Sequence, residues 1–109
     1  MAASNKYFHE VAMEKGFEEI EKIYDSNISR LASIQHDVWA HWQSYLHSQC
    51  VLNDDGSLTI PKELVEHWER QIKTAYEDLS LEERESDDNQ VKKSKSIILT
   101  MLLEAKKIK

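Results

Sequence analysis

Apolar positions in the first half of the chain recur every seven residues. One series comprises Phe17, Tyr24, Leu31, Val38 and Tyr45. A second series, three residues later in each repeat, comprises Ile20, Asn27, Ile34 and His41. This spacing is typical of a helix with a coiled-coil seam that includes one polar position.

Two structures remain open for this segment. One long helix would measure roughly 65 Å at the rise per residue of an α-helix. Such a helix cannot fold onto one small core, so it predicts a homodimer. The seam would then consist of Phe17, Ile20, Tyr24, Asn27, Leu31 and Ile34, with Asn27 fixing the register. The alternative is two helices, over about residues 5–25 and 28–48, with Asp25 or Ser26 capping the second.

The middle of the chain carries turn signals. The run Asn53-Asp54-Asp55-Gly56 separates two short apolar pieces, which predicts a hairpin-like loop or an extended connection around residues 49–60. Pro61 suits the first turn of a following helix that runs to about Thr74, with an apolar face that includes Trp68.

Ser80 and Glu83 have the spacing of a capping box, which predicts the start of the last helix. Acidic residues dominate the first turns of this helix and lysines dominate its end, which matches the helix dipole. We interpret both charged runs as a solvated helix face. The fold class predicted from these patterns is all-α: three to four helices, with a long N-terminal helix and a short hairpin-like loop.

Composition excludes several function classes. The formal net charge of −6 argues against a general nucleic-acid binder. A single cysteine, Cys50, cannot form an internal disulfide. No signal-peptide pattern or membrane-length apolar run is present. We therefore expect a cytoplasmic protein, or one in the host cytoplasm if it is viral.

Catalytic and metal-binding motifs are not found in the sequence. None of the five histidines has the i, i+4 spacing of a helical zinc pair, and there is no Cys-x-x-Cys. Cys50 lacks the surroundings of a nucleophile, and Gly16 and Gly56 are too far apart for a phosphate loop. We expect no enzyme activity, no metal and no cofactor.

Aromatic residues form the most informative cluster. Trp39, Trp42, Trp68 and Tyr76 lie close together in the sequence, and each one singly is expected to pack in the core. Arg70 can stack on a ring or hold an anion. It can equally be a surface residue paired with an acidic neighbour such as Glu66.

The order of these residues resembles a ryanodine-receptor repeat domain over about residues 34–103. The similarity rests on the segments 36–39 (His-Asp-Val-Trp), 68–71 (Trp-Glu-Arg-Gln) and 76–80 (Tyr-Glu-Asp-Leu-Ser). It departs from the repeat at Ala75, Asp88 and residues 48–50. We therefore expect two parts, a repeat-like helical domain over residues 34–109 and an N-terminal helix over 1–33. The N-terminal helix has no counterpart in the repeat, and the seven-residue spacing predicts it as the oligomerisation element.

The resemblance implies a non-catalytic, phage-type accessory protein, since bacterial and phage members accompany nucleotide-signalling and defence systems. A pocket for a nucleotide-like small molecule would use His36, Trp39, Trp68, Arg70 and Tyr76. The alternative is an acidic protein-interaction module that inhibits a host protein complex, as anti-CRISPR-type inhibitors do, with the aromatics serving only as core.

Overall fold

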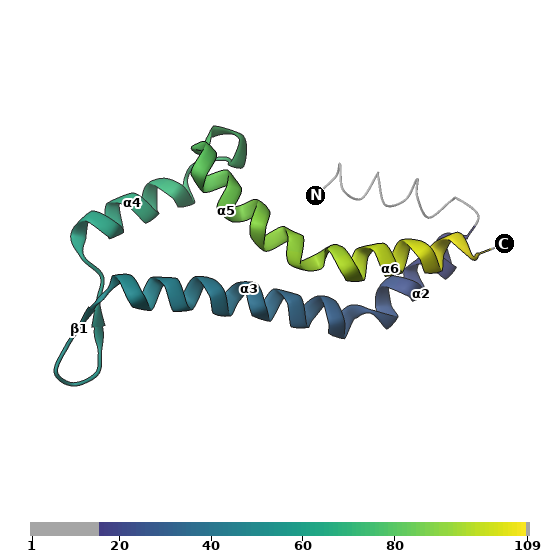
Figure 1. Ribbon diagram of the computed structural model, residues 1–109, viewed down its shortest axis with the longest axis horizontal. Helices are drawn as coiled ribbons and strands as arrows, with labels where there is room; N and C mark the ends of the chain where they lie inside the picture. The colour runs from purple at the N-terminus through teal and green to yellow at the C-terminus, as the bar shows by residue number, and fades with distance from the viewer. Residues whose placement is uncertain (1–15, 109) are drawn as a thin grey trace. The chain divides into compact units, whose positions relative to one another are not determined.

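The computed structural model describes residues 16–108, which are mostly helical and include one small hairpin (Figure 1). This confirms the all-α prediction. The helices and strands, in chain order, are α2 (Phe17–Ser26), α3 (Ile28–Gln49), β1 (Val51–Leu52), β2 (Leu58–Thr59), α4 (Lys62–Ile72), η1 (Tyr76–Asp78), α5 (Leu81–Val91), η2 (Lys92–Ser94) and α6 (Lys95–Lys106). The part of the predicted first helix that precedes residue 16 lies outside the described residues.

Contacts divide the chain into two compact units. Among the described residues, the terminal unit combines residues 16–34 with residues 94–108, and the central unit is Gln35–Lys93. The boundary near residue 34 falls inside α3. The predicted division into 1–33 and 34–109 differs from this arrangement at the C-terminal end, because α6 packs against α2 in the terminal unit.

Asn27 separates α2 from α3, so the alternative of two helices is the one that the structure adopts. The Asn27 side chain is only 3 % exposed, and its Nδ2 donates to the Ile23 carbonyl at 2.7 Å. Ser26 also turns its hydroxyl back to that carbonyl, at 3.0 Å. Within the described part of the chain, neither Asp25 nor Ser26 caps α3, because the local hydrogen bonds of this junction point to the preceding turn.

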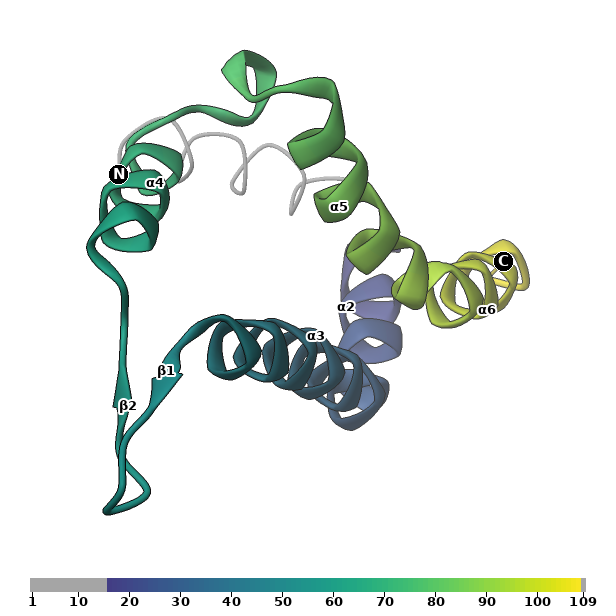
Figure 2. The ribbon, with the colours of Figure 1, turned by 60° about the vertical axis from the view of Figure 1, so that its left-hand side comes forward.

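The predicted hairpin is confirmed at β1 and β2, which pair antiparallel with Val51 opposite Thr59 (Figure 2). Gly56 has a φ of 88°, a left-handed conformation that glycine adopts at little cost. The Asp55 carboxylate accepts from the Ser57 hydroxyl and backbone N–H, at 2.6 and 2.9 Å, and these bonds lower the pKa of Asp55. Pro61 then takes the N-cap position of α4.

The capping box at the start of α5 is confirmed. The Ser80 hydroxyl accepts from the Glu83 N–H at 3.2 Å, and the Glu83 carboxylate accepts from the Ser80 N–H at 3.4 Å. The prediction of one continuous last helix is wrong, because the 3₁₀ turn η2 separates α5 from α6. A short 3₁₀ segment at a helix end needs no Gly or Pro, so a run of lysine and serine gave no signal for it.

Candidate functional site

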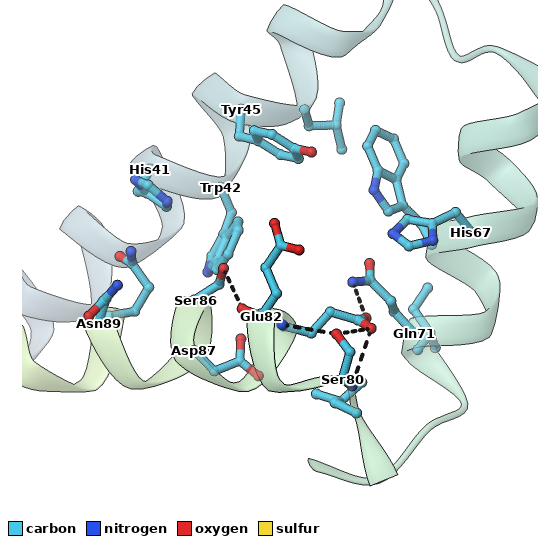
Figure 3. Close-up of a pocket in the computed structure, with 16 residues that line it drawn as sticks. His41, Trp42, Tyr45, His67, Gln71, Ser80, Glu82, Ser86, Asp87 and Asn89 are labelled. Atoms are coloured by element: carbon cyan, nitrogen blue, oxygen red, sulfur yellow. Dashed lines mark hydrogen bonds between the residues drawn. The ribbon is translucent and has the colours of Figure 1, made fainter. Parts of the chain in front are cut away.

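Three helices of the central unit surround an open cleft of about 850 Å³ (Figure 3). The cleft is lined by side chains from residues 41, 42, 45 and 46 of α3, from residues 67, 68, 71 and 72 of α4, and from residues 82, 83, 86, 87 and 90 of α5. In each helix these residues are three to five apart or adjacent, so they share one helical face. The helical period therefore puts the lining side chains of each helix on the same side of that helix.

Aromatic side chains form one wall of the cleft. Trp42 lies edge-on to two neighbours on α3, with centroid separations of 4.8 Å to His41 and 6.3 Å to Tyr45. Trp68 contributes a further indole from α4. Trp42 and Trp68 are half-buried and Tyr45 is 47 % exposed. Ring surface at this wall is therefore accessible to a ligand.

Glu83 connects two of the helices that line the cleft. Its carboxylate accepts hydrogen bonds from Gln71 Nε2 on α4, at 2.5 Å, and from the Ser80 hydroxyl, at 2.8 Å. The bond from Gln71 is the main cause of the lowered pKa of Glu83, and the bond from Ser80 adds to it. Glu83 is therefore ionised at neutral pH, and its bonds hold α4 against the start of α5.

Two other carboxylates on α5 have no such partners. Glu82 and Asp87 line the cleft, and within residues 16–108 neither side-chain carboxylate makes a hydrogen bond or an ion pair. Figure 3 shows the Glu82 carboxylate extending into the cleft on the side of Trp42. No Lys or Arg side chain belongs to the lining. The cleft thus offers carboxylate acceptors and aromatic faces without a cation of its own.

Of the five predicted ligand contacts, only Trp68 lines this cleft. His36 and Trp39 stack on each other on α3, with ring centroids 5.6 Å apart, and Trp39 is 55 % exposed. Arg70 Nη2 lies 2.8 Å from Nδ1 of His67, so Arg70 reaches the cleft only through that imidazole.

Tyr76 serves a different contact. Its hydroxyl donates to Asp88 Oδ1 at 2.6 Å, which attaches η1 to α5. This hydrogen bond is the main cause of the raised pKa of Tyr76. The structure therefore does not bring the five predicted residues together at one cleft, and their ligand contacts stay a prediction.

Sequence reasoning missed most of the residues that line the cleft. Trp42 was expected in the core, and the acidic residues of α5 were interpreted as a solvated face. A signal was available in the spacing of Glu82, Glu83 and Asp87, which places three carboxylates on one side of a helix. That spacing becomes informative only when α3 and α4 are known to face the same side.

Carboxylates next to aromatic faces favour a cationic ligand. An ammonium or guanidinium group is attracted by both the ring faces and the negative charges. A phosphate would instead meet the charges of Glu82, Glu83 and Asp87, and like charges repel at this range. The chemistry of the lining therefore selects for positive charge.

Residues 16–108 contain no group of three or more His, Cys, Asp or Glu side chains placed to hold a metal ion. Within the same residues, no helix is both long and apolar enough to span a membrane. No protein-family model, curated protein or solved structure matches this chain. The resemblance to the ryanodine-receptor repeat therefore stays a prediction.

Proposed function

We propose that this protein is a non-catalytic interaction module whose cleft holds a cationic side chain, arginine or lysine, of a protein partner. The observation that carries the proposal is the pair of unpartnered carboxylates, Glu82 and Asp87, in a cleft walled by Trp42, Tyr45 and Trp68. A guanidinium between these groups would exchange its hydration for hydrogen bonds to carboxylate and contact with a ring face.

The charge of the whole chain supports a basic partner. A net charge of −6 accelerates encounter with a positively charged surface and disfavours encounter with an acidic one. This agrees with the hypothesis of an acidic, phage-type inhibitor that docks on a basic surface of a host protein complex. The aromatic residues then contribute to binding instead of serving only as core.

A nucleotide-derived ligand is the second candidate. Trp68 supplies a ring face for a base, and Arg70 lies against His67 at the edge of the cleft, which favours this version. The three carboxylates of α5 weigh against it because they would face the phosphates. The basic protein partner is therefore the better-supported proposal.

Two further proposals concern the setting of this module. A single cysteine suits a reducing compartment, so we place the protein in the cytoplasm, or in the host cytoplasm if it comes from a phage. We also propose that the chain self-associates, as the seven-residue repeat predicts. Neither proposal depends on the identity of the ligand.

Fluorescence anisotropy with a labelled nona-arginine peptide tests the cleft. The double variant Glu82→Gln/Asp87→Asn removes both unpartnered carboxylates and keeps the side-chain shapes. We expect it to weaken binding roughly tenfold or more, the effect of losing a charge-assisted contact. The matched control Glu77→Gln/Glu85→Gln changes the net charge equally at exposed positions outside the cleft, and should weaken binding less than about twofold.

The outcomes separate the candidates. Equal weakening by the two double variants would mean that the peptide senses only overall charge, and would refute a cleft site. Calorimetric titration with mononucleotides, cyclic nucleotides and ADP-ribose should give no heat at about 100 μM protein, where micromolar binding would be evident. Saturable nucleotide binding that Trp68→Ala abolishes would instead favour the second candidate.

A further inference from the structure

The helix α6 exposes an apolar face. Four large apolar residues of α6 are exposed: Ile98 (44 % exposed), Leu99 (49 %), Leu102 (61 %) and Leu103 (62 %). Their spacing puts them on one side of the helix. The other side carries Ile97, which is 7 % exposed and is the one buried apolar side chain among the described residues. A helix that is apolar on both sides is normally covered on both.

The exposed face is large for a chain of this size. The four side chains present on the order of 400 Å² of apolar surface, which is the size that marks an interaction site. On α2, which packs against α6, Ile20 is 50 % exposed and Tyr24 is 49 % exposed. Together the two helices provide a large part of the roughly 800 Å² that each partner contributes to a stable interface.

Charges on the two helices are complementary. α2 is acidic, with Glu21 and Asp25 beside the row of Ile20 and Tyr24, and with two further acids in its first turn. α6 carries Lys95 at its start and Lys106 at its end, and the helical period puts both on its exposed side. A two-fold axis would place the acidic α2 of one copy against the basic α6 of the other, twice.

We infer that a second copy of this chain covers the exposed faces of α6 and α2, which form the interface of a two-fold homodimer. This inference rests on the self-association proposed above and is independent of the cleft. It moves the interface from the predicted helical seam to α6, while Ile20 and Tyr24 keep their predicted role. Asn27 is inside the protomer, bonded to Ile23, and does not take part.

Light scattering on the full chain tests the interface. At about 100 μM, a concentration at which a micromolar dimer is mostly formed, we expect twice the chain mass of 12.8 kDa. Leu102→Glu should give the monomer mass with unchanged helicity by circular dichroism. The matched control Leu81→Glu places the same charge at a leucine of similar exposure on α5, outside α6 and α2, and should leave the dimer intact.

A charge-swap experiment avoids any effect of Leu102 on folding. The variants Lys95→Glu/Lys106→Glu and Glu21→Lys/Asp25→Lys should each dimerise at least fivefold more weakly than the wild type, and an equimolar mixture should recover dimers. A monomeric wild type, a dimeric Leu102→Glu, or a mixture no tighter than its components would each overturn the inference. The nona-arginine titration is unaffected by these outcomes, so failure of the dimer and failure of the cleft are distinguishable.

Discussion

Replacing Asn27 with leucine tests how the chain breaks between α2 and α3. The side chain is 3 % exposed, and its Nδ2 donates to the Ile23 carbonyl at 2.7 Å. Its Oδ1 accepts a long bond from Arg30 Nη1 at 3.5 Å. Leucine has a similar size but can make neither bond. The structure therefore predicts that Asn27→Leu destabilises the protomer.

The magnitude follows from the contacts. A buried hydrogen bond contributes about 1 to 1.5 kcal/mol net, and the bond to Arg30 adds little at its length. The Ile23 carbonyl is not left unpaired, because the Ser26 hydroxyl still reaches it at 3.0 Å. A different side-chain shape in a packed site adds less than about 1 kcal/mol. We expect a total loss of about 2 kcal/mol, or roughly 10 °C in Tm for a domain of this size.

A coiled-coil seam predicts the opposite sign. An asparagine at a buried seam position specifies register and lowers stability, so leucine there would strengthen association. Urea unfolding followed by circular dichroism, at two protein concentrations, distinguishes the two. Ser26→Ala is the matched control, because it removes the exposed hydroxyl from the same carbonyl, and should cost less than about 0.5 kcal/mol. A stabilised Asn27→Leu variant would refute the intramolecular role.

Three other substitutions give distinct results. Trp39→Ala should lower the free energy of unfolding in urea by about 1 kcal/mol, not the 3 to 5 kcal/mol of a core deletion, because the ring is 55 % exposed; a larger loss would contradict its surface position. Glu83→Gln should be less stable than wild type at pH 7. Because the carboxylate pKa is lowered, that difference should disappear as pH falls below the ordinary value of 4.5, and a constant difference in thermal melts would argue against the bond from Gln71. Tyr76→Phe should also melt below wild type. Because the phenol pKa is raised, this gap should persist up to the ordinary value of 10.0 and close at higher pH; a gap unchanged by pH would exclude the bond to Asp88.

Local signals predicted local structure well. The capping box at Ser80 and Glu83 and the hairpin around Gly56 each depend on residues within a few positions of one another, and both are present. The sequence does not decide the junction at Asn27, because an asparagine at this position fits both a coiled-coil seam and a helix break. The hydrogen bond from Asn27 to the Ile23 carbonyl distinguishes the two, and the position of that carbonyl is known only from the structure.

The cleft could not be assembled from the sequence because its parts come from three helices. The seven-residue series includes Tyr45, and Trp42 is expected in the core. Both interpretations concealed that these rings have accessible surface. The acidic run of α5 fits the helix dipole, so no further role was needed to explain it. Trp68 was found because an indole in a small charged chain is informative wherever it lies.

The acidic run of α5 separates stability from binding. Glu83 has its hydrogen bonds satisfied by Gln71 and Ser80, so it contributes to the fold. The carboxylates of Glu82 and Asp87 have no hydrogen-bond or ion-pair partner in the described part of the chain, so they hold no helices together. Glu82 lies in the first turn of α5, where the helix dipole favours a negative charge, so neutralising both carboxylates should lower the free energy of unfolding by at most about 1 kcal/mol, while binding of a cation is lost. Charged groups that contribute so little to the fold and lie together at a cleft are typical of sites that serve binding and not stability.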